Sequence, residues 1–311
     1  MWNTATGAQV AASEAHGAPV VAVAVSPDGA RVASLGWDGR VLVFPTRGRA
    51  PGAGIELAGQ DRKSRDIAFS PDGRRLVTAG SGGAAKIWDA ATGALLWTLL
   101  GHQGDVLQAF FTGDGQAVLS VAMDGTARRW SARTGRLEWT FFGHRDGIWA
   151  AHVDAAGERL VTASADGTAR VWRARQQRHL RALRAPGSVL MHASLAPDRE
   201  RVATIDVGGT VRVWDGRGSE VATMAAGYRD TSFPHRVSWS PDGDRLLASG
   251  GPRALVWDAR TGAPRLEIDH GGWLLRATWA RDGARIVTAG DGTIKLWDAG
   301  TGALLQVRRK T

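Results

Sequence analysis

The chain has 311 residues, no cysteine, a net charge of +9 and 43% apolar residues. The apolar content is sufficient for a large core, and the lack of cysteine excludes disulfides, thiol nucleophiles and cysteine-ligated metals. No run of 18 apolar residues occurs, and the start lacks the regions of a signal peptide. We therefore expect a soluble, cytoplasmic protein that does not enter a membrane.

The chain opens with a segment that recurs later in the sequence. Trp2–Ala8 mirrors Trp88–Ala94, so residues 2–14 are expected to form an extra outer strand and loop. A second candidate for the same place, residues 303–307, stands at the other end, and the sequence does not choose between them. The surplus strand suggests that the chain was cut from a longer one or that one end is a linker.

A Trp-Asp pair or a close variant then recurs at a nearly fixed spacing. The spacing of about 42 residues indicates one supersecondary unit copied along the chain, and this length suits four strands better than a pair of helices. The copies stand at Phe44, Trp88, Trp130, Trp172, Trp214, Trp257 and Trp297.

Each copy has the same internal order of strands and turns. An apolar strand leads into a turn such as Ser70-Pro71-Asp72-Gly73, where proline fixes φ and glycine accepts a positive φ. A second strand follows, typified by 75–79, and then an Asp-Gly hairpin turn such as Asp124-Gly125. The third strand ends at the tryptophan, and a Thr-Gly turn leads to a fourth strand. Four short antiparallel strands per unit are typical of a propeller blade.

These motifs, in register from Trp2 to Val307, resemble the WD-repeat β-propeller family. The resemblance implies an all-β fold, a single seven-bladed propeller with four antiparallel strands per blade. We expect one domain over residues 1–311, in which residues 2–14 could close the ring. The expected blades are approximately 18–58, 62–100, 104–142, 146–184, 187–225, 232–268 and 272–308.

One set of polar residues recurs with the blades and has the composition of a hydrolytic triad. An enzyme needs one such site, so several copies favour a structural role. Ligands placed one per blade also cannot converge on one metal ion. The resemblance implies that each set forms a buried hydrogen-bond network with the indole as the last donor. The sets are His16, Ser34 and Asp38; His102, Ser120, Asp124 and Trp130; His144, Thr162, Asp166 and Trp172; and His270, Thr288, Asp291 and Trp297.

The polar set is incomplete in four blades, which we expect to be the softer ones. Phe44 of blade 1 has no indole donor. The other replacements at the histidine, hydroxyl or aspartate positions are Gln60 and Gly82 in blade 2, Pro186 and Gly208 in blade 5, and Tyr228, Leu247 and Gly251 in blade 6.

Residues that the repeat does not explain are the candidates for function. Three tryptophans fall outside the repeat positions, and a two-residue insertion lengthens the loop that begins at Tyr228. The resemblance places these segments, with several basic residues, on one face, where aromatic side chains serve as interface anchors. Packing between blades is the alternative role for each tryptophan. The candidate partner-binding residues are Trp37, Arg62, Lys63, Arg65, Met123, Arg145, Trp149, Tyr228, Arg229, Phe233, His235, Arg253 and Trp273.

A run of six arginines in blade 4 supports a different class of function. No acidic residue stands between Asp166 and Asp198, so the run could hold phosphates or an acidic partner. It lacks the interleaved aromatic residues of a stacking platform, which favours a solvated edge over a nucleic-acid site. The run consists of Arg170, Arg173, Arg175, Arg178, Arg181 and Arg184.

We therefore predict a non-catalytic scaffold or sensor that binds a protein or peptide, such as an acidic one, within a larger signalling or assembly system. It is expected to be a monomer or a domain of a larger chain, with no cofactor, metal or membrane partner. The alternatives are binding of nucleic acid or another polyanion through arginine-rich surfaces and, less favoured, an enzyme with its site at the channel mouth. The sequence shows neither a glycine-rich phosphate loop nor an unexplained cluster of histidine and acidic residues.

Overall fold

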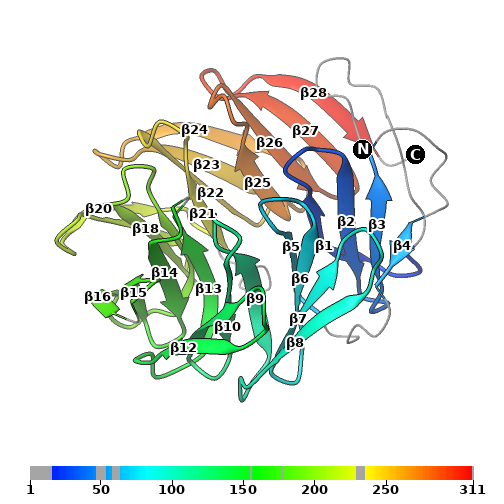
Figure 1. The fold of residues 1–311 in the computed structure, drawn as a ribbon. Helices are drawn as coiled ribbons and strands as arrows, with labels where there is room; N and C mark the ends of the chain where they lie inside the picture. Colours follow the sequence, from blue (N-terminus) through cyan, green and yellow to red (C-terminus); the bar gives the residue numbers. More distant parts are fainter. Residues whose placement is uncertain are drawn as a thin grey trace. The chain divides into compact units, whose positions relative to one another are not determined.

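The computed structural model describes residues 16–46, 54–57, 64–154, 156–176, 178–228 and 235–309. Within these ranges the chain forms 28 strands and no helix. The strands make seven four-stranded antiparallel sheets, and the strand order in each sheet follows the chain (Figure 1). The prediction of an all-β propeller with seven blades of four antiparallel strands is confirmed.

Each sheet is one blade. Blade 1 contains β1 (Val20–Val25), β2 (Arg31–Gly36), β3 (Val41–Pro45) and β4 (Ile55–Glu56). Blade 2 contains β5 (Asp66–Phe69), β6 (Arg75–Ala79), β7 (Ala84–Asp89) and β8 (Leu95–Leu100). Blade 3 contains β9 (Val106–Phe111), β10 (Ala117–Ala122), β11 (Ala127–Ser131) and β12 (Leu137–Phe141). Blade 4 contains β13 (Ile148–Val153), β14 (Arg159–Ser164), β15 (Thr168–Arg173) and β16 (Arg178–Arg184).

The remaining three blades continue the same order. Blade 5 contains β17 (Leu190–Leu195), β18 (Val202–Asp206), β19 (Thr210–Trp214) and β20 (Glu220–Ala225). Blade 6 contains β21 (Arg236–Trp239), β22 (Arg245–Gly250), β23 (Arg253–Asp258) and β24 (Pro264–Asp269). Blade 7 contains β25 (Arg276–Trp279), β26 (Arg285–Gly290), β27 (Thr293–Asp298) and β28 (Leu304–Arg309).

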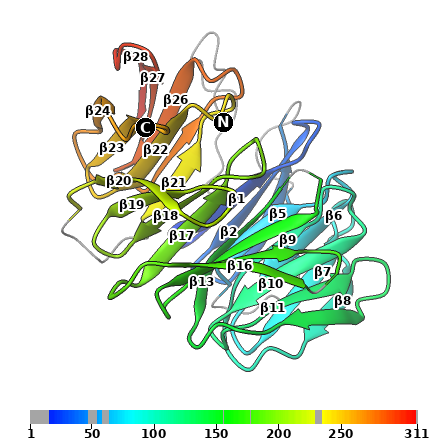
Figure 2. The same cartoon turned by 90° about the vertical axis from the view of Figure 1, so that its left-hand side faces the viewer.

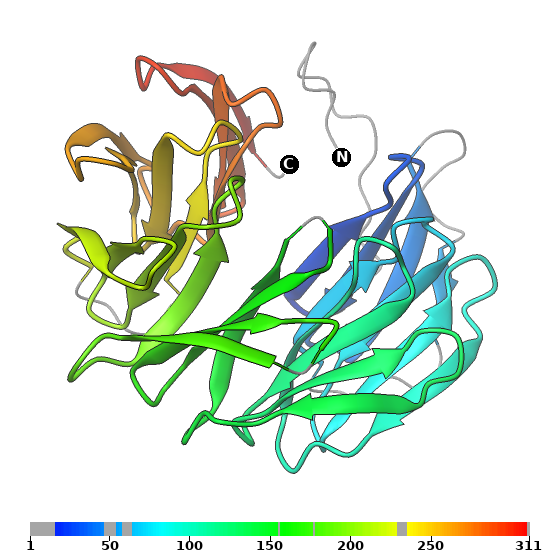
Figure 3. The same ribbon diagram turned by 60° about the vertical axis from the view of Figure 1, so that its left-hand side comes forward.

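The chain divides into two compact units. The first comprises Met1–Trp149, Ala155–Glu158 and Arg173–Arg178, and includes blades 1 to 3. The second comprises Ala150–Asp154, Arg159–Trp172 and His179–Thr311, and includes most of blade 4 and blades 5 to 7. In the first unit, β9 lies beside β5 (Figure 2), and in the second the sheets of blades 6 and 7, yellow to red, lie beside each other (Figure 3).

Side chains on the middle strands build the core between neighbouring blades. Every residue of β10 is buried, whereas five of the six residues of β8 are exposed. Val77 and Ile87 of blade 2 pack in one cluster with Phe111 and Trp130 of blade 3. The apolar faces of adjacent sheets are therefore buried against each other, as expected for stacked sheets with exposed outer strands.

The Ser-Pro-Asp-Gly segments form the expected turns between first and second strands. In blade 2 the buried Ser70 hydroxyl donates to Asp72 Oδ1 at 2.5 Å and accepts from Arg75 N at 2.9 Å. Gly73 has a φ of 69°, a conformation that glycine adopts without steric cost. The serine thus replaces backbone partners that the turn would otherwise leave unsatisfied.

An arginine at the start of the second strand links each of several blades to the next one. Arg75 donates from one guanidinium nitrogen to the Gly115 carbonyl at 3.0 Å and from the other to the Ala132 carbonyl at 2.8 Å. Its guanidinium also lies 5.3 Å from the centre of the Phe111 ring. We call this arrangement the arginine clamp, and no pattern in the sequence indicated it. Arg31, Arg201 and Arg245 bond in the same way to Gly73, Gly243 and Gly283 and lie over Phe69, Trp239 and Trp279.

The fourth strand of blade 7 comes from the C-terminal part of the chain. Strand β28 pairs with β27 in antiparallel register, with Lys295 opposite Val307. Of the two segments that the sequence offered for this place, 303–307 supplies it. The other candidate, residues 2–14, lies outside the described residues.

Candidate functional site

The complete polar set of blade 3 forms one continuous hydrogen-bond network. The Trp130 indole donates to Ser120 Oγ at 2.8 Å, and Ser120 Oγ lies 2.8 Å from His102 Nε2. His102 Nδ1 lies 3.0 Å from Asp124 Oδ2. Because the serine oxygen accepts the indole proton, its own proton goes to Nε2, and Nδ1–H then donates to the carboxylate.

The same network is unsuited to nucleophilic catalysis. Ser120 is fully buried on β10, and its oxygen is bonded both to the indole and to the imidazole. The Asp124 carboxylate is occupied by the backbone of Gln103 and by Thr126 Oγ1, at 2.9 and 2.7 Å. Burial opposes ionisation of Asp124, but these hydrogen bonds outweigh it and hold its pKa below the usual 3.8. A satisfied buried network of this kind fixes the loop and the two strands to one another.

Other blades carry parts of this network. In blade 1, His16 bonds to Ser34 at 2.8 Å and to Asp38 at 3.1 Å. In blade 4, Trp172 donates to Thr162 at 3.0 Å. His144 belongs to the first unit, so its contacts with Thr162 and Asp166 stay a prediction. Trp88 and Trp214 also donate to threonines, Thr78 and Thr204, although blades 2 and 5 lack the histidine and aspartate.

Blade 7 departs from the expected arrangement. Trp297 donates to Thr288 at 2.8 Å, and His270 Nδ1 bonds to the same hydroxyl at 2.9 Å. The other imidazole nitrogen lies 3.1 Å from the Gly290 carbonyl, so in this structure the ring bonds to backbone in place of Asp291. Asp291 accepts from the backbone N–H of Trp273. The turn is one residue shorter here, and Asp291 adopts a positive φ of 43°, which moves its carboxylate away from the histidine.

The register also corrects one position of blade 6. Counting back ten residues from Trp257 assigns Leu247 to the hydroxyl position. In the structure Trp257 pairs with Leu246 across the sheet, and the hydroxyl position lies two residues after this partner, at Ala248. The same offset from Trp297 reaches Thr288, which does bond its indole. Neither Leu247 nor Ala248 has a hydroxyl group, so blade 6 lacks the hydroxyl that accepts the indole hydrogen bond in blades 2 to 5 and 7.

Two exposed apolar side chains stand at matching turns of blades 1 and 3. Trp37 and Met123 each precede the turn aspartate, and these residues are 68% and 41% exposed. Their backbones are fixed, because Trp37 N donates to Pro19 O at 2.9 Å and Met123 N to Asp105 O at 3.0 Å. Apolar groups held toward solvent by an ordered backbone are suited to contact with a partner.

Four more of the candidate residues are exposed. Trp149 stands at the start of β13, Arg65 precedes β5 and Arg145 precedes β13, and all three residues belong to the first unit. Arg65 lies 3.8 Å from Asp105, a long ion pair between partly exposed groups. Trp273 is exposed in the second unit, in the loop before β25. Together with Trp37 and Met123, these residues keep the predicted combination of aromatic and basic side chains.

Two apolar residues outside the predicted set are as exposed as Trp37. Leu100 and Phe142 end or follow a fourth strand, each directly before a Gly-His pair, and are 67% and 69% exposed. An apolar residue directly before a Gly-His pair is the sequence signal that could have identified both residues. We define the turn face as the exposed set in the first unit: Trp37, Arg65, Leu100, Met123, Phe142, Arg145 and Trp149.

Three other candidate residues make contacts with neighbouring residues of the second unit. Tyr228 and His235 are buried, with their rings 5.0 Å apart, and His235 Nδ1 lies 3.1 Å from the Asp206 carbonyl. Burial raises the pKa of the Tyr228 hydroxyl far above its usual 10. Arg253 pairs with Glu267 at 2.5 Å. These positions do not fit a role for Tyr228 and His235 at an exposed face, because both side chains anchor the ends of the insertion. Arg62, Lys63, Arg229 and Phe233 lie outside the described residues.

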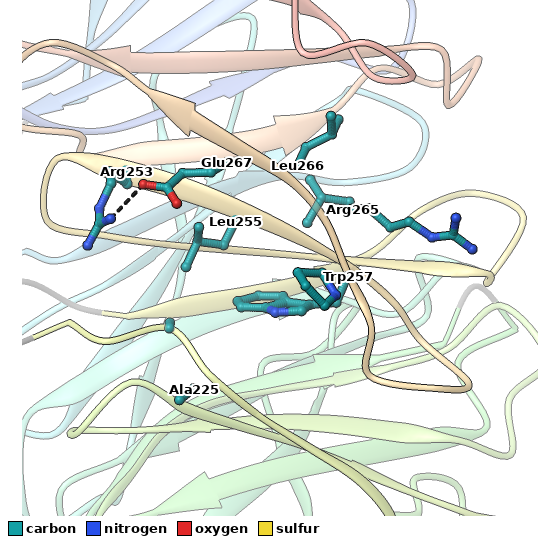
Figure 4. A pocket seen from close by; sticks show the side chains of 10 residues that line it. Ala225, Arg253, Leu255, Trp257, Arg265, Leu266 and Glu267 are labelled. Atoms are coloured by element: carbon teal, nitrogen blue, oxygen red, sulfur yellow. Dashed lines mark hydrogen bonds and ion pairs between the residues drawn. The ribbon is translucent and has the colours of Figure 1, made fainter.

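A cavity of about 370 Å³ opens beside β23 and β24 in the second unit. Leu255, Leu266 and Trp257 form its apolar wall, and the Arg253–Glu267 ion pair stands at one end (Figure 4). Its lining contains no serine, threonine or histidine that could act as a nucleophile or base. Among the described residues, no group of three or more histidine, aspartate or glutamate side chains is arranged to hold a metal ion.

The blade 4 arginines are partly committed to contacts with the protein. Arg175 pairs with Asp114 at 2.8 Å, and Arg181 donates to the Asp215 carbonyl at 3.2 Å. Arg173, Arg178 and Arg184 are exposed. The described part of the chain contains no helix capable of spanning a bilayer.

Stability should fall as the pH drops below about 6.5. Four histidines have a lowered pKa, and burial is the largest cause in each case: His102, His152, His179 and His192. In that pH range the unfolded chain binds more protons than the folded chain, because the pKa values of these imidazoles are lower in the folded state. Protonation therefore favours unfolding. Urea unfolding at pH 7.5 and about 5.5 measures the effect, and His102→Gln should reduce the difference. Greater stability at the lower pH would contradict this assignment.

Five stretches of the chain match the family model of the WD domain, G-beta repeat: residues 7–44, 56–89, 93–131, 135–173 and 264–298. They cover more than half of the 311 residues, and the chain therefore belongs to the WD40 repeat family. The longest stretch without a match, 174–263, includes blade 5 and the first three strands of blade 6, and both blades lack the histidine and aspartate of the network.

The chain is also similar to a curated plant protein. It is 29% identical over 106 residues to Periodic tryptophan protein 2 of Arabidopsis thaliana. The similar segment covers 33% of this chain and 11% of that protein, so the chain spans about a tenth of the length of this relative.

Proposed function

We propose that this WD40 chain is a non-catalytic scaffold that binds a protein or peptide through the turn face. The observation that carries the proposal is the pair of exposed side chains, Trp37 and Met123, at matching turns. Each directly precedes an aspartate whose carboxylate is bonded to a buried or partly buried histidine, so the turns are rigid. A rigid aromatic or thioether group loses little conformational entropy when a partner covers it.

The charges next to these side chains support an acidic partner. Arg65 and Arg145 stand at exposed positions of the turn face, and the chain as a whole carries a net charge of +9. Cationic groups around an apolar contact raise the association rate of an anionic partner and weaken its binding at high salt. The WD40 family assignment supports protein binding as the class of function, and the similarity to Periodic tryptophan protein 2 is to another repeat protein.

Replacing the two tryptophans of the turn face tests the proposal. The variant Trp37→Ala, Trp149→Ala should recover fewer proteins in affinity capture than the unchanged chain, because each tryptophan supplies a large apolar contact. Trp97→Ala is a matched control, since Trp97 is also 41% exposed but belongs to the fourth strand of blade 2. Unfolding curves establish that all variants are folded. Equal recovery by the double variant and the unchanged chain would show that these residues do not form the binding face.

A further inference from the structure

Three consecutive blades of the second unit carry a basic side chain at the same position of the first strand. His192 of β17, Arg236 of β21 and Arg276 of β25 each stand three residues before the end of the strand. Their partners across the sheet, Ile205, Ser249 and Ala289, are also equivalent in register. We call the three basic residues the cation arc. At this position blade 4 has Ala150.

The three residues of the cation arc are close enough to act on one another. Burial is the main reason why the pKa of His192 lies well below 6.5, and Arg236, His152 and Arg276 lower it further by repulsion. The backbone of Val237 acts on the imidazole in the opposite direction and raises its pKa. Strands β17 and β21 pack together, and β21 packs against β25, so the mutual repulsion arises from neighbouring strands.

One atom of the cation arc is buried without a partner. His192 Nδ1 has almost no solvent contact and no hydrogen-bond partner within the described structure. Buried polar atoms in folded proteins are nearly always satisfied, and an exception indicates a functional role or a bound group. Nδ1 can accept a proton and then donate to an anion placed beside the two arginines.

Hydroxyl groups stand two residues farther along the same strands. Because side chains alternate along a strand, Ser194, Ser238 and Thr278 lie on the same side as the basic residue of their strand. Guanidinium forks and hydroxyl groups are the donors that bind phosphate and sulfate oxygens in proteins. No carboxylate occurs at either of these two positions in blades 5 to 7.

We infer that the cation arc binds a small oxyanion group of the phosphate or sulfate class, with Arg236 and Arg276 as the main donors and His192 as a protonated third donor. The cation arc consists of residues of the second unit, whereas the turn face consists of residues of the first unit. Bound anion compensates the repulsion among the three cations and satisfies His192 Nδ1. Anion binding is therefore coupled to uptake of a proton.

Sulfate is the suitable first probe, because it carries the same charge at every pH used. Titration calorimetry should show tighter sulfate binding at about pH 5.5 than at pH 8, where His192 is neutral. The other groups that face this histidine are Arg236, Arg276 and His152, and Asp154 acts on His152. His192→Gln should remove most of the pH dependence, whereas His152→Gln should leave most of it in place.

Arginine replacements test the site itself. Arg236→Gln and Arg276→Gln should each weaken sulfate binding about tenfold, which corresponds to loss of one charged hydrogen bond of about 1.4 kcal/mol. Arg281→Gln removes the same charge from an exposed position in the turn before β26 and should leave the dissociation constant unchanged. Unfolding midpoints verify that each variant is folded.

Two results would overturn the inference: absence of sulfate binding to the unchanged chain at low ionic strength, or equal weakening by all three arginine variants. A comparison of inorganic phosphate with phenyl phosphate then distinguishes the source of the anion. Tighter binding of phenyl phosphate supports a phosphate ester as ligand, and tighter binding of inorganic phosphate supports the free anion.

Discussion

Replacing Ser120 by alanine is expected to lower the free energy of unfolding by about 2 kcal/mol. The substitution removes the acceptor of the Trp130 indole and the partner of His102 Nε2, both at 2.8 Å, at a position with no solvent access. Water cannot replace the lost hydroxyl, so two buried polar groups remain unsatisfied. Equilibrium unfolding in urea, monitored by tryptophan fluorescence, measures the change.

Ser120→Thr is the matched control for this substitution. Threonine occupies the equivalent position in blades 2, 4, 5 and 7, where it accepts the indole hydrogen bond at 2.8 to 3.0 Å. The threonine variant should therefore retain most of the stability. An unfolding free energy of Ser120→Ala equal to that of the unchanged chain would exclude a stabilising role for the network.

Replacing Arg75 by alanine should also cost about 2 kcal/mol of stability, because the variant loses two charged hydrogen bonds and a cation–π contact. The Gly115 and Ala132 carbonyls belong to blade 3, so the substitution weakens the junction between blades 2 and 3. Arg75 is only partly buried, and solvent therefore compensates a share of the loss. Thermal and urea unfolding measure the change.

Two further variants separate the clamp from a simple effect of charge. Arg74→Ala removes the exposed neighbouring arginine and should change stability by less than about 0.5 kcal/mol. Arg75→Lys keeps the charge but cannot donate to two carbonyls through a planar fork, so it should resemble Arg75→Ala more than the unchanged chain. Equal stabilities for Arg74→Ala and Arg75→Ala would show that the clamp contributes nothing specific.

The repeated turns made the fold predictable from the sequence. Ser70-Pro71-Asp72-Gly73 and its copies mark each first hairpin by local chemistry, and the tryptophans mark the end of each third strand. These signals depend on near neighbours in the chain and on periodicity. The arginine clamp was not predictable in the same way, because Arg75 reaches carbonyls 40 and 57 residues away.

The network and the candidate face were predictable only in part. The His-to-Asp interval of 22 residues indicated the contacts that His16 and His102 make. In blade 7 a turn shorter by one residue redirects Asp291 to a backbone donor, an effect that spacing alone does not reveal. Tyr228 and His235 were polar aromatic residues in an apparent loop, but their burial depends on packing against Asp206 and Arg253 from other segments.

The central claim, that the recurring His, Ser or Thr, Asp and Trp sets stabilise the blades, is tested most directly by a double-mutant cycle between Ser120 and Trp130. Urea unfolding of Ser120→Ala, Trp130→Phe and the double variant gives the coupling energy of the buried indole–hydroxyl pair. Trp130→Phe has a natural parallel, since blade 1 carries Phe44 at this position. We predict a coupling of about 1 kcal/mol or more. Strictly additive losses would contradict the claim that these side chains act together to hold the blade.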